Sequence, residues 1–213
     1  MISAERFAAF LAAAVVLAAI PGPGMLYVVA RTLGGGRREG LISTAGTAIG
    51  GSVHVVAAAL GLSALLATSA VAFTVVKYVG AAYLVFLGLR LLWQARKRAA
   101  SVETVELRGV GSGWAALRQG ALTEALNPKT ALFFLAFVPQ FVDPSAGWVI
   151  LQSVVFGVIS VTLNSLADIV AVGLSGVVHR RIARRGSEPE PRWPKVASGS
   201  ALLALGGYAA VEG

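Results

Sequence analysis

An apolar segment runs from Phe7 to Ala30 and is interrupted by four consecutive helix-breaking residues, Pro21-Gly22-Pro23-Gly24. The part before the interruption, Phe7–Ile20, has 14 residues, fewer than the roughly 20 that a helix needs to cross a bilayer. The whole segment has 24 residues, which is enough. We therefore expect the interruption at membrane depth, where non-helical backbone is tolerated only against protein or a water-filled cavity. This makes it a candidate wall of a binding site.

The whole chain has the composition of an integral membrane protein. Of its 213 residues, 56% are hydrophobic and 13% are charged, and the mean hydropathy is +0.76. A soluble domain has about 25% charged residues. The absence of cysteine excludes disulfides, thiol redox chemistry and thiolate metal sites. Two histidines and no cluster of His, Asp and Glu argue against a metal site, and no cofactor motif or nucleophile–base arrangement is visible, so neither a cofactor nor an enzyme is expected.

Six apolar blocks predict six membrane-spanning helices. They are Phe7–Ala30, Leu41–Ala67, Val71–Trp93, Ala115–Val142, Trp148–Val178 and Lys195–Val211. The fifth block has 31 residues and must be tilted, kinked or extended past the membrane. Because the N-terminus has no clearly basic region and no small-residue cleavage site follows Ile20, we expect a retained first span rather than a cleaved signal peptide.

The basic residues are distributed unevenly between the connections. Fifteen of the 18 Lys and Arg residues lie in or beside the connections 31–40, 96–114 and 179–195, whereas those around 68–70 and 143–145 contain none. With six spans, the three basic connections fall on one side, and Lys and Arg in short loops mark the cytoplasmic side. We therefore predict a multi-pass membrane protein with both termini outside. The net charge of +8 then reflects topology, and no nucleic acid partner is expected.

We expect the chain to form a single transporter domain over 1–213 that is built from two repeats. A glycine-rich linker at about 96–114 separates a first repeat at about 1–95 from a second at about 115–213. The fourth block contains Asn127-Pro128-Lys129 at the position that matches the interruption of the first. Asparagine is a good N-cap and proline is favoured in the first helical turn, so a half-helix is expected to start there.

Because each half has an odd number of spans, three, the two halves have opposite orientations in the membrane. Broken helices at corresponding positions of two opposed halves point to a transporter's midplane binding site. The predicted fold is an all-α integral membrane protein with six transmembrane helices in two inverted three-helix repeats, whose first and fourth helices are broken. The alternative at each interruption is a proline kink without a ligand.

The two interruptions offer complementary chemistry for a zwitterion. A half-helix start presents free N–H groups and the positive end of its dipole, which favour an anion. Lys129 in that first turn needs an anion nearby, either Glu124, Asp168 or a substrate carboxylate, while the carbonyls before Pro21 could accept an ammonium group. The candidate substrate-binding residues are Pro21, Gly22, Pro23, Asn127, Pro128 and Lys129.

Polar residues inside the other apolar blocks are candidates for proton coupling. A charge at the bilayer centre costs about 2.5–3.5 kcal/mol on insertion scales and is a functional-site hypothesis by default. Asn164 and Asp168 are four residues apart and share one helix face. The candidate proton-coupling residues are His54, Glu124, Asn164 and Asp168. The alternative is that these groups only tie helices together.

A GxxxG pattern, Gly46 to Gly50, is expected to let two helices approach closely. The pattern and the short sixth block permit a homodimer without requiring one.

Motifs in both halves resemble those of a known family. They are Pro21-Gly22-Pro23, Gly36-Arg37-Arg38-Glu39-Gly40-Leu41, Gly46, Gly50, His54 and Gly61-Leu62 in the first half, and Gly120-Ala121-Leu122-Thr123, Asn127-Pro128-Lys129, Phe133-Phe134-Leu135-Ala136-Phe137 and Pro139-Gln140-Phe141-Val142-Asp143-Pro144 in the second. Over nearly the whole chain they resemble the LysE/RhtB family of amino-acid exporters. The resemblance implies an exporter of the bacterial inner membrane, driven by the proton motive force, and leaves the exported amino acid undefined.

We therefore predict a secondary active transporter that exports amino acids or close derivatives by proton antiport with alternating access. Its expected partners are an amino-acid substrate, protons and membrane lipid. Two alternatives stay open. An ion or metal transporter on the same scaffold would need Asp168, Glu124 and His54 to converge, and a non-transporting membrane assembly subunit would pack its broken spans without a cavity.

Overall fold

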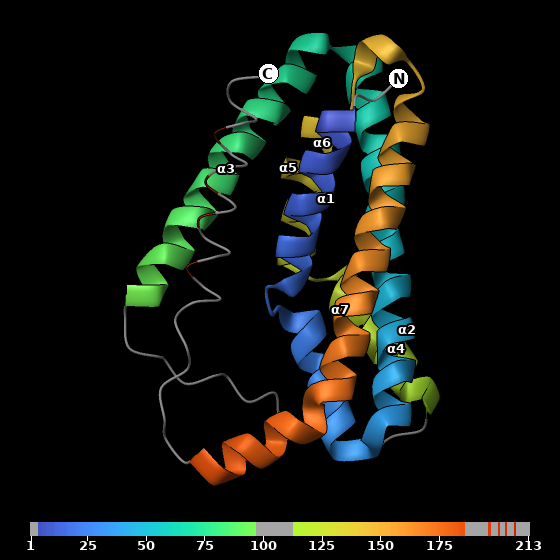
Figure 1. Cartoon of the computed structure of the whole chain (residues 1–213). Helices are drawn as coiled ribbons and strands as arrows, with labels where there is room; N and C mark the ends of the chain where they lie inside the picture. The colour runs from blue at the N-terminus through green and yellow to red at the C-terminus, as the bar shows by residue number, and fades with distance from the viewer. Residues whose placement is uncertain are drawn as a thin grey trace.

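The computed structural model describes residues 4–96 and 113–185 and the isolated positions 196, 200, 203 and 207. All regular structure in these residues is helical, so the predicted all-α class is confirmed there (Figure 1). The elements are α1 (Ala4–Ala19), α2 (Pro23–Thr68), α3 (Ala70–Arg96), α4 (Gly113–Ala125), α5 (Pro128–Ala136), α6 (Val138–Phe141), the 3-10 helix η1 (Pro144–Ala146) and α7 (Val149–Arg185). The sixth predicted span, 195–211, and most of the predicted linker lie outside the described residues.

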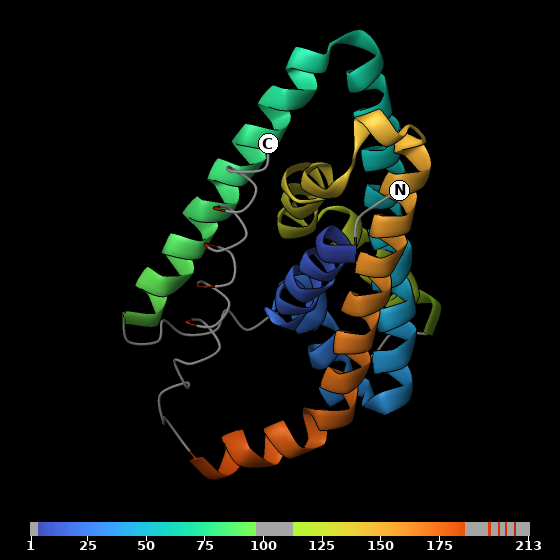
Figure 2. The same ribbon diagram turned by 45° about the horizontal axis from the view of Figure 1, so that its top comes forward.

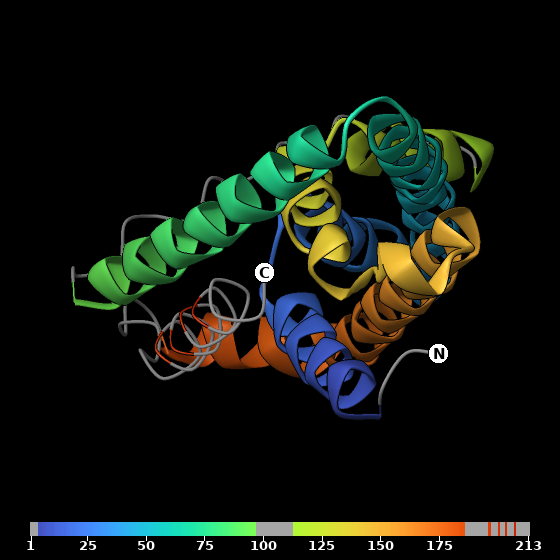
Figure 3. The same ribbon diagram turned by 90° about the horizontal axis from the view of Figure 1, so that it is seen from above.

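Helix α2 consists of two helical arms that meet at a kink at Gly36, and it packs along both α4 and α7, while α1 packs against α7. Helix α3 touches α2 and the short helices α5 and α6 near its start and then diverges from the bundle, as the three views agree (Figures 1, 2 and 3). The last turns of α7 also bend away from the bundle axis. The fifth predicted span therefore extends past the bundle, as its length requires.

Helices α2 and α4 approach closely because glycines form their contact surface. A Cβ added at Gly46 would overlap the carbonyl oxygen of Leu117, and one added at Gly50 would overlap that of Ala121. The predicted role of this GxxxG pattern in close helix packing is confirmed. Because its partner is α4 of the same chain, the pattern offers no argument for a homodimer.

Four phenylalanines join α1, α6 and the first half of α7. Phe10, Phe137, Phe141 and Phe156 are all fully buried. The ring of Phe10 lies 4.5 Å from that of Phe156 and 5.4 Å from those of Phe137 and Phe141, between centroids. These distances are in the favourable range for aromatic pairs. The cluster fixes α1 against the helices that follow α5.

The sequence predicts a connection over residues 31–40, and in the structure two helical arms of α2 meet there, at a kink at Gly36. At the bend Gly36 has φ 82° and ψ 176°, a conformation that side-chain-bearing residues rarely adopt. Arg31, at the start of this connection, is only 3% exposed, and its Nε lies 3.5 Å from Glu39 Oε2 across the bend. A glycine- and arginine-rich stretch resembles a loop in composition, and the partner that allows Arg31 to be buried becomes visible only in three dimensions.

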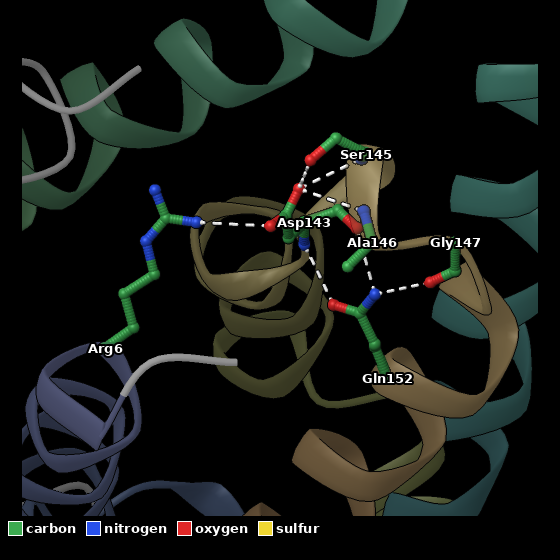
Figure 4. Close-up of polar contacts among 6 residues, drawn as sticks. All are labelled: Arg6, Asp143, Ser145, Ala146, Gly147 and Gln152. Carbon is green, nitrogen blue, oxygen red and sulfur yellow. Dashed lines mark hydrogen bonds and ion pairs between the residues drawn. The ribbon is translucent and has the colours of Figure 1, made fainter. Parts of the chain in front are cut away.

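The connection between α6 and α7, at the opposite end of the bundle, is held by side chains (Figure 4). Asp143 Oδ1 accepts hydrogen bonds from the backbone N–H and the hydroxyl of Ser145, at 2.9 and 2.6 Å. The amide of Gln152 accepts from the Asp143 N–H at 2.9 Å and donates to the Gly147 carbonyl at 2.6 Å. Arg6 in the first turn of α1 lies 3.9 Å from Asp143 Oδ2, which links this connection to α1.

The two ends of the bundle differ in charge. The bend of α2, the start of α4 and the end of α7 lie at the lower end in Figure 1, and their segments contain Arg37, Arg38, Arg118 and the arginines of 180–185. The turn between α2 and α3 and the α6–α7 connection lie at the upper end and contain neither Lys nor Arg. We call the first of these the basic end.

The distribution of polarity is that of a membrane protein. Many large apolar side chains are more than half exposed, among them Val56, Leu60, Val79, Leu166 and Val170. The buried residues, in contrast, include Arg31, Thr47, Asn127, Ser160 and Asp168. Helix α2 and the Val149–Ser175 part of α7 are long and apolar enough to cross a membrane. Polar groups that point into a bundle whose outside is apolar are expected where the surrounding solvent is lipid.

Candidate functional site

A cavity lies where the interruption between α1 and α2 meets the interruption between α4 and α5. Its lining combines residues of both interruptions with residues of α2, α3 and α7. About 60 Å³ is open to the centres of water-sized molecules, compared with the roughly 10–15 Å³ that one water requires. The cavity therefore has room for a small solute.

The second interruption has the capping geometry that the sequence predicts. Asn127 is extended, with φ −74° and ψ 110°, and its side-chain oxygen accepts a hydrogen bond from the Lys129 N–H at 3.0 Å. Pro128 occupies the first turn of α5. Since Asn127 is only 3% exposed, its amide is committed to the interior of the protein.

The side chain of Lys129 reaches across to the first interruption. Its ammonium donates hydrogen bonds to the carbonyls of Ile20, at 2.6 Å, and Leu17, at 3.2 Å. Carbonyls at the end of α1 lack partners within the helix and carry the negative end of its dipole, so they attract a cation. The sequence predicts that these carbonyls could hold a substrate's ammonium group, whereas in the structure they hold that of Lys129.

Two glycines allow the interruptions to touch. A Cβ added at Gly22 would lie 2.9 Å from Cδ of Lys129, and one added at Gly24 would overlap the carboxylate of Glu124. Gly22 was a sequence candidate, but Gly24 was missed. Gly24 belongs to the same Pro-Gly cluster, so its place in the sequence could have indicated it. The sequence does not show, however, which residues of the cluster meet Glu124.

Glu124 is held from both sides by residues of the second interruption. Its Oε2 accepts a hydrogen bond from the Asn127 side-chain amide at 3.0 Å, and its Oε1 accepts one from the Thr130 hydroxyl at 2.5 Å. His54 Nε2 lies 3.0 Å from the backbone carbonyl of Glu124, so this nitrogen is the donor, and the ring of His54 stacks on Phe134. His54 thus supports the site from behind rather than lining the cavity.

Asp168 faces the cavity from α7 together with Asn164, which confirms their predicted common face. The Thr47 hydroxyl of α2 lies 3.0 Å from Asp168 Oδ2 and 2.9 Å from the Thr44 carbonyl. Because a hydroxyl has a single proton, it serves only one of these acceptors at a time. Asn164 donates to the Ser160 carbonyl of its own helix at 2.9 Å.

The structure separates the sequence candidates into two groups. Those that line the cavity are Gly22, Glu124, Asn127, Lys129, Asn164 and Asp168. Those that do not are Pro21, Pro23, Pro128 and His54. The three prolines are exposed and act by limiting the helices on either side of each interruption. Within the described residues, no three His, Cys, Asp or Glu side chains are grouped so that they could hold a metal ion.

The remaining lining is largely apolar and includes Leu17, Met25, Phe133, Phe134 and Val161. Thr47 and Thr130, which position the two carboxylates, were missed because a threonine in an apolar helix carries little sequence signal. A mostly apolar lining with a few convergent polar groups is typical of small-molecule sites. The cavity can take a molecule that carries both charged and apolar groups.

Comparison with known proteins identifies the family. Residues 15–213 match the family described as LysE type translocator. A membrane protein of Vibrio cholerae, itself uncharacterized, is 37% identical over 159 residues, which are 74% of this chain and 75% of that protein.

A leucine efflux protein of an Enterobacter species is 33% identical over 141 residues, 66% of this chain and 65% of the relative, so the match covers just under two thirds of that relative. The membrane protein YrhP of Bacillus subtilis is 34% identical over 142 residues, 63% of this chain and 67% of the relative. No solved structure matches the chain. The resemblance of the motifs is confirmed, and the chain belongs to the LysE type translocator family.

Proposed function

We propose that the protein is a secondary active transporter that exports amino acids or close derivatives across the bacterial inner membrane. The observation that carries the proposal is the cavity in which Lys129 joins the two interruptions, with Glu124 and Asp168 in the same lining. Membership of a translocator family and the relatives named leucine efflux proteins support it. Transport runs by alternating access, coupled to protons that move in the opposite direction.

The proposed topology has six spans in two inverted repeats, with the first and fourth spans broken at residues 21–24 and 127–129. The basic end of the bundle faces the cytoplasm and both termini lie outside. Support comes from the arginines that gather at one end of the bundle and from the Lys and Arg bias of cytoplasmic loops. It also comes from the general placement of transporter sites between paired broken helices.

In the proposed complex, a zwitterionic amino acid lies with its charged end at the polar wall. Its carboxylate contacts the Lys129 ammonium, which has a third N–H besides those given to Leu17 and Ile20. Its ammonium contacts Asp168. Its side chain lies against Phe133 and Phe134, which favours an apolar amino acid such as leucine.

We assign the coupling proton to Asp168. Glu124 accepts hydrogen bonds on both of its oxygens, from Asn127 and Thr130, and these hold it in place. The Thr47 hydroxyl donates its single proton either to Asp168 or to the Thr44 carbonyl. A carboxylate that binds either a proton or the substrate's ammonium provides antiport directly, because the two compete for one group.

Counterflow of labelled leucine in liposomes tests the site, and a competition screen of the common amino acids then identifies the substrate. We expect Lys129→Ala and Asp168→Asn to reduce counterflow about tenfold to a hundredfold, since hydrogen bonds to charged groups contribute about 1.5–3 kcal/mol. Asp143→Asn is the matched control, because it removes a carboxylate outside the cavity. Unchanged counterflow in both cavity variants would remove the site assignment.

Coupling is tested by imposing a pH gradient on the same liposomes. The counterflow that survives in Lys129→Ala should still respond to the gradient. The counterflow that survives in Asp168→Asn should not. A full response in Asp168→Asn would move the coupling proton to another residue.

A further inference from the structure

Between the cavity and the basic end, the two arms of α2 meet in two layers, the first of which includes Val172 of α7. Tyr27 and Val28 lie one helical turn beyond the cavity residue Gly24. They form a small buried cluster with Val172, which lies one turn beyond the cavity residue Asp168. One turn further, Arg31 pairs with Glu39. Each helical turn rises about 5.4 Å, so the ion pair lies roughly two turns from the cavity.

The first of these layers leaves little space. The Tyr27 hydroxyl donates to the Ala116 carbonyl of α4 at 2.8 Å, which closes the layer on one side. On the other side, a Cβ added at Gly40 would overlap the Thr32 hydroxyl and lie 2.9 Å from a Val172 methyl group. The two arms of α2 and helix α7 are therefore in direct contact here.

The second layer is a buried ion pair across the kink at Gly36. The side chains of Arg31 and Glu39 are 3% and 12% exposed and belong to opposite arms of α2, on either side of Gly36. A buried ion pair contributes little net stability compared with apolar residues, although removing one partner is strongly destabilising, and its best-attested use is to select one arrangement over another. Hinges are commonly a few residues that absorb a large backbone change.

We propose that the Tyr27–Val28–Val172 layer and the Arg31–Glu39 pair form the gate between the cavity and the basic end. The ion pair holds the gate shut in the present structure, and separation of the two arms of α2 about Gly36 opens it. The inference rests on the proposed transport function for what passes through the gate, which is the amino acid. It concerns access to the cavity, which is measurable without any substrate.

The absence of native cysteine makes a direct accessibility test feasible. A single Ser165→Cys in the cavity lining reports access, through its rate of labelling by a membrane-impermeant thiol reagent added to sealed vesicles. A separate Arg37→Cys, exposed on the bend, shows which vesicle orientation presents the basic end to the reagent. In the Ser165→Cys background, Glu39→Gln should raise labelling from the basic end by on the order of tenfold, because it removes the charge of Glu39 from the buried pair that joins the two arms.

Arg37→Gln is the matched control, since it removes an exposed charge from the same bend and should leave labelling unchanged. The exchange Arg31→Glu with Glu39→Arg should return the rate toward that of the parent. If Glu39→Gln does not elute as a folded protein, Glu39→Asp, which shortens the pair, takes its place. Equal labelling of the parent and the folded Glu39 variant would overturn the gate. Faster labelling in a protein that shows no counterflow would support the gate while contradicting the proposed transport function.

Discussion

The two interruptions of this chain differ in how the free backbone groups at their helix ends find hydrogen-bond partners. At the second, Asn127 caps the new helix with its own side chain and Pro128 fills the first turn. At the first, α2 begins after Gly22, which offers no side-chain cap, and the carbonyls at the end of α1 receive the ammonium of Lys129. The second interruption thus finds its hydrogen-bond partner within the same segment, whereas the carbonyls of the first depend on a residue more than one hundred positions away.

This difference makes Lys129 the element that couples the two halves. Its amide belongs to the cap of the second interruption, and its ammonium completes the first. A substrate carboxylate that attracts this ammonium would weaken its hold on Ile20 and so loosen α1. Binding at the cavity would thereby be communicated to the helix that packs against α7.

The largest expected effect comes from removing this coupling. Lys129→Met keeps the length of the side chain but leaves the Ile20 carbonyl without its charged partner. We expect a loss of roughly 2–4 kcal/mol in the free energy of unfolding, measured as a lower thermal midpoint in detergent. Arg37→Met, an exposed cation on the α2 bend, should cost less than about 0.5 kcal/mol. Equal midpoints for the two variants would show that the first interruption does not depend on Lys129.

The second interruption should lose stability in two separable parts. Asn127→Ala removes the cap, worth about 1 kcal/mol, and the donor to Glu124, worth about the same. Asn127→Ser restores a capping oxygen but is too short to reach Glu124, so it should recover about half of the loss. The thermal midpoints of the parent, Asn127→Ala and Asn127→Ser separate the two contributions. If Asn127→Ser is as unstable as Asn127→Ala, the whole loss comes from the hydrogen bond to Glu124.

The two glycines of the first interruption should respond unequally to alanine. The carboxylate that meets Gly24 is fixed by two hydrogen bonds, whereas the atoms of Lys129 that meet Gly22 belong to a flexible chain. We expect Gly24→Ala to cost about 1 kcal/mol after its gain in helix propensity, and Gly22→Ala to cost less. The same thermal assay compares them, and the reverse order would indicate that Lys129 is the more rigid neighbour.

The sequence allowed the backbone of the site to be predicted better than its side-chain partners. The cap at Asn127 and Pro128 and the helix ends around Pro21 follow from local rules, and the structure confirms the cap. That Lys129 bonds the end of α1 depends on how two distant segments pack. The same limit explains why the prolines, which mark the site in the sequence, do not line the cavity, while Thr47 and Thr130 do.

The bend of α2 is a second place where local sequence rules predict the backbone but not the side-chain contacts. Residues 31–40 have the composition of a loop, and Gly36 does adopt a conformation that favours glycine. Helical arms lie on both sides of Gly36, and Arg31 is buried against Glu39 across this kink, a contact between the two arms that no local rule anticipates.

The smallest expected effect concerns the same capping chemistry in an exposed setting. Asp143 caps η1 much as Asn127 caps α5, but its side chain is 27% exposed, so water can replace the lost acceptor. Asp143→Ala should therefore cost less than Asn127→Ala. The hydrogen bond from the Ser145 hydroxyl, helped by two backbone N–H groups and by Arg6, holds the pKa of Asp143 below its ordinary value, against an opposing effect of burial.

A lowered pKa in the folded state means that this contribution is present above about pH 4, the ordinary range of Asp. It is lost as the pH falls through the folded-state value. The thermal midpoints of the parent and Asp143→Ala should thus converge in acid, whereas the gap between the parent and Asn127→Ala should not close through the cap, because an asparagine amide does not titrate. A gap at Asp143 that persists below this range would show that the residue acts there through packing rather than through its charge.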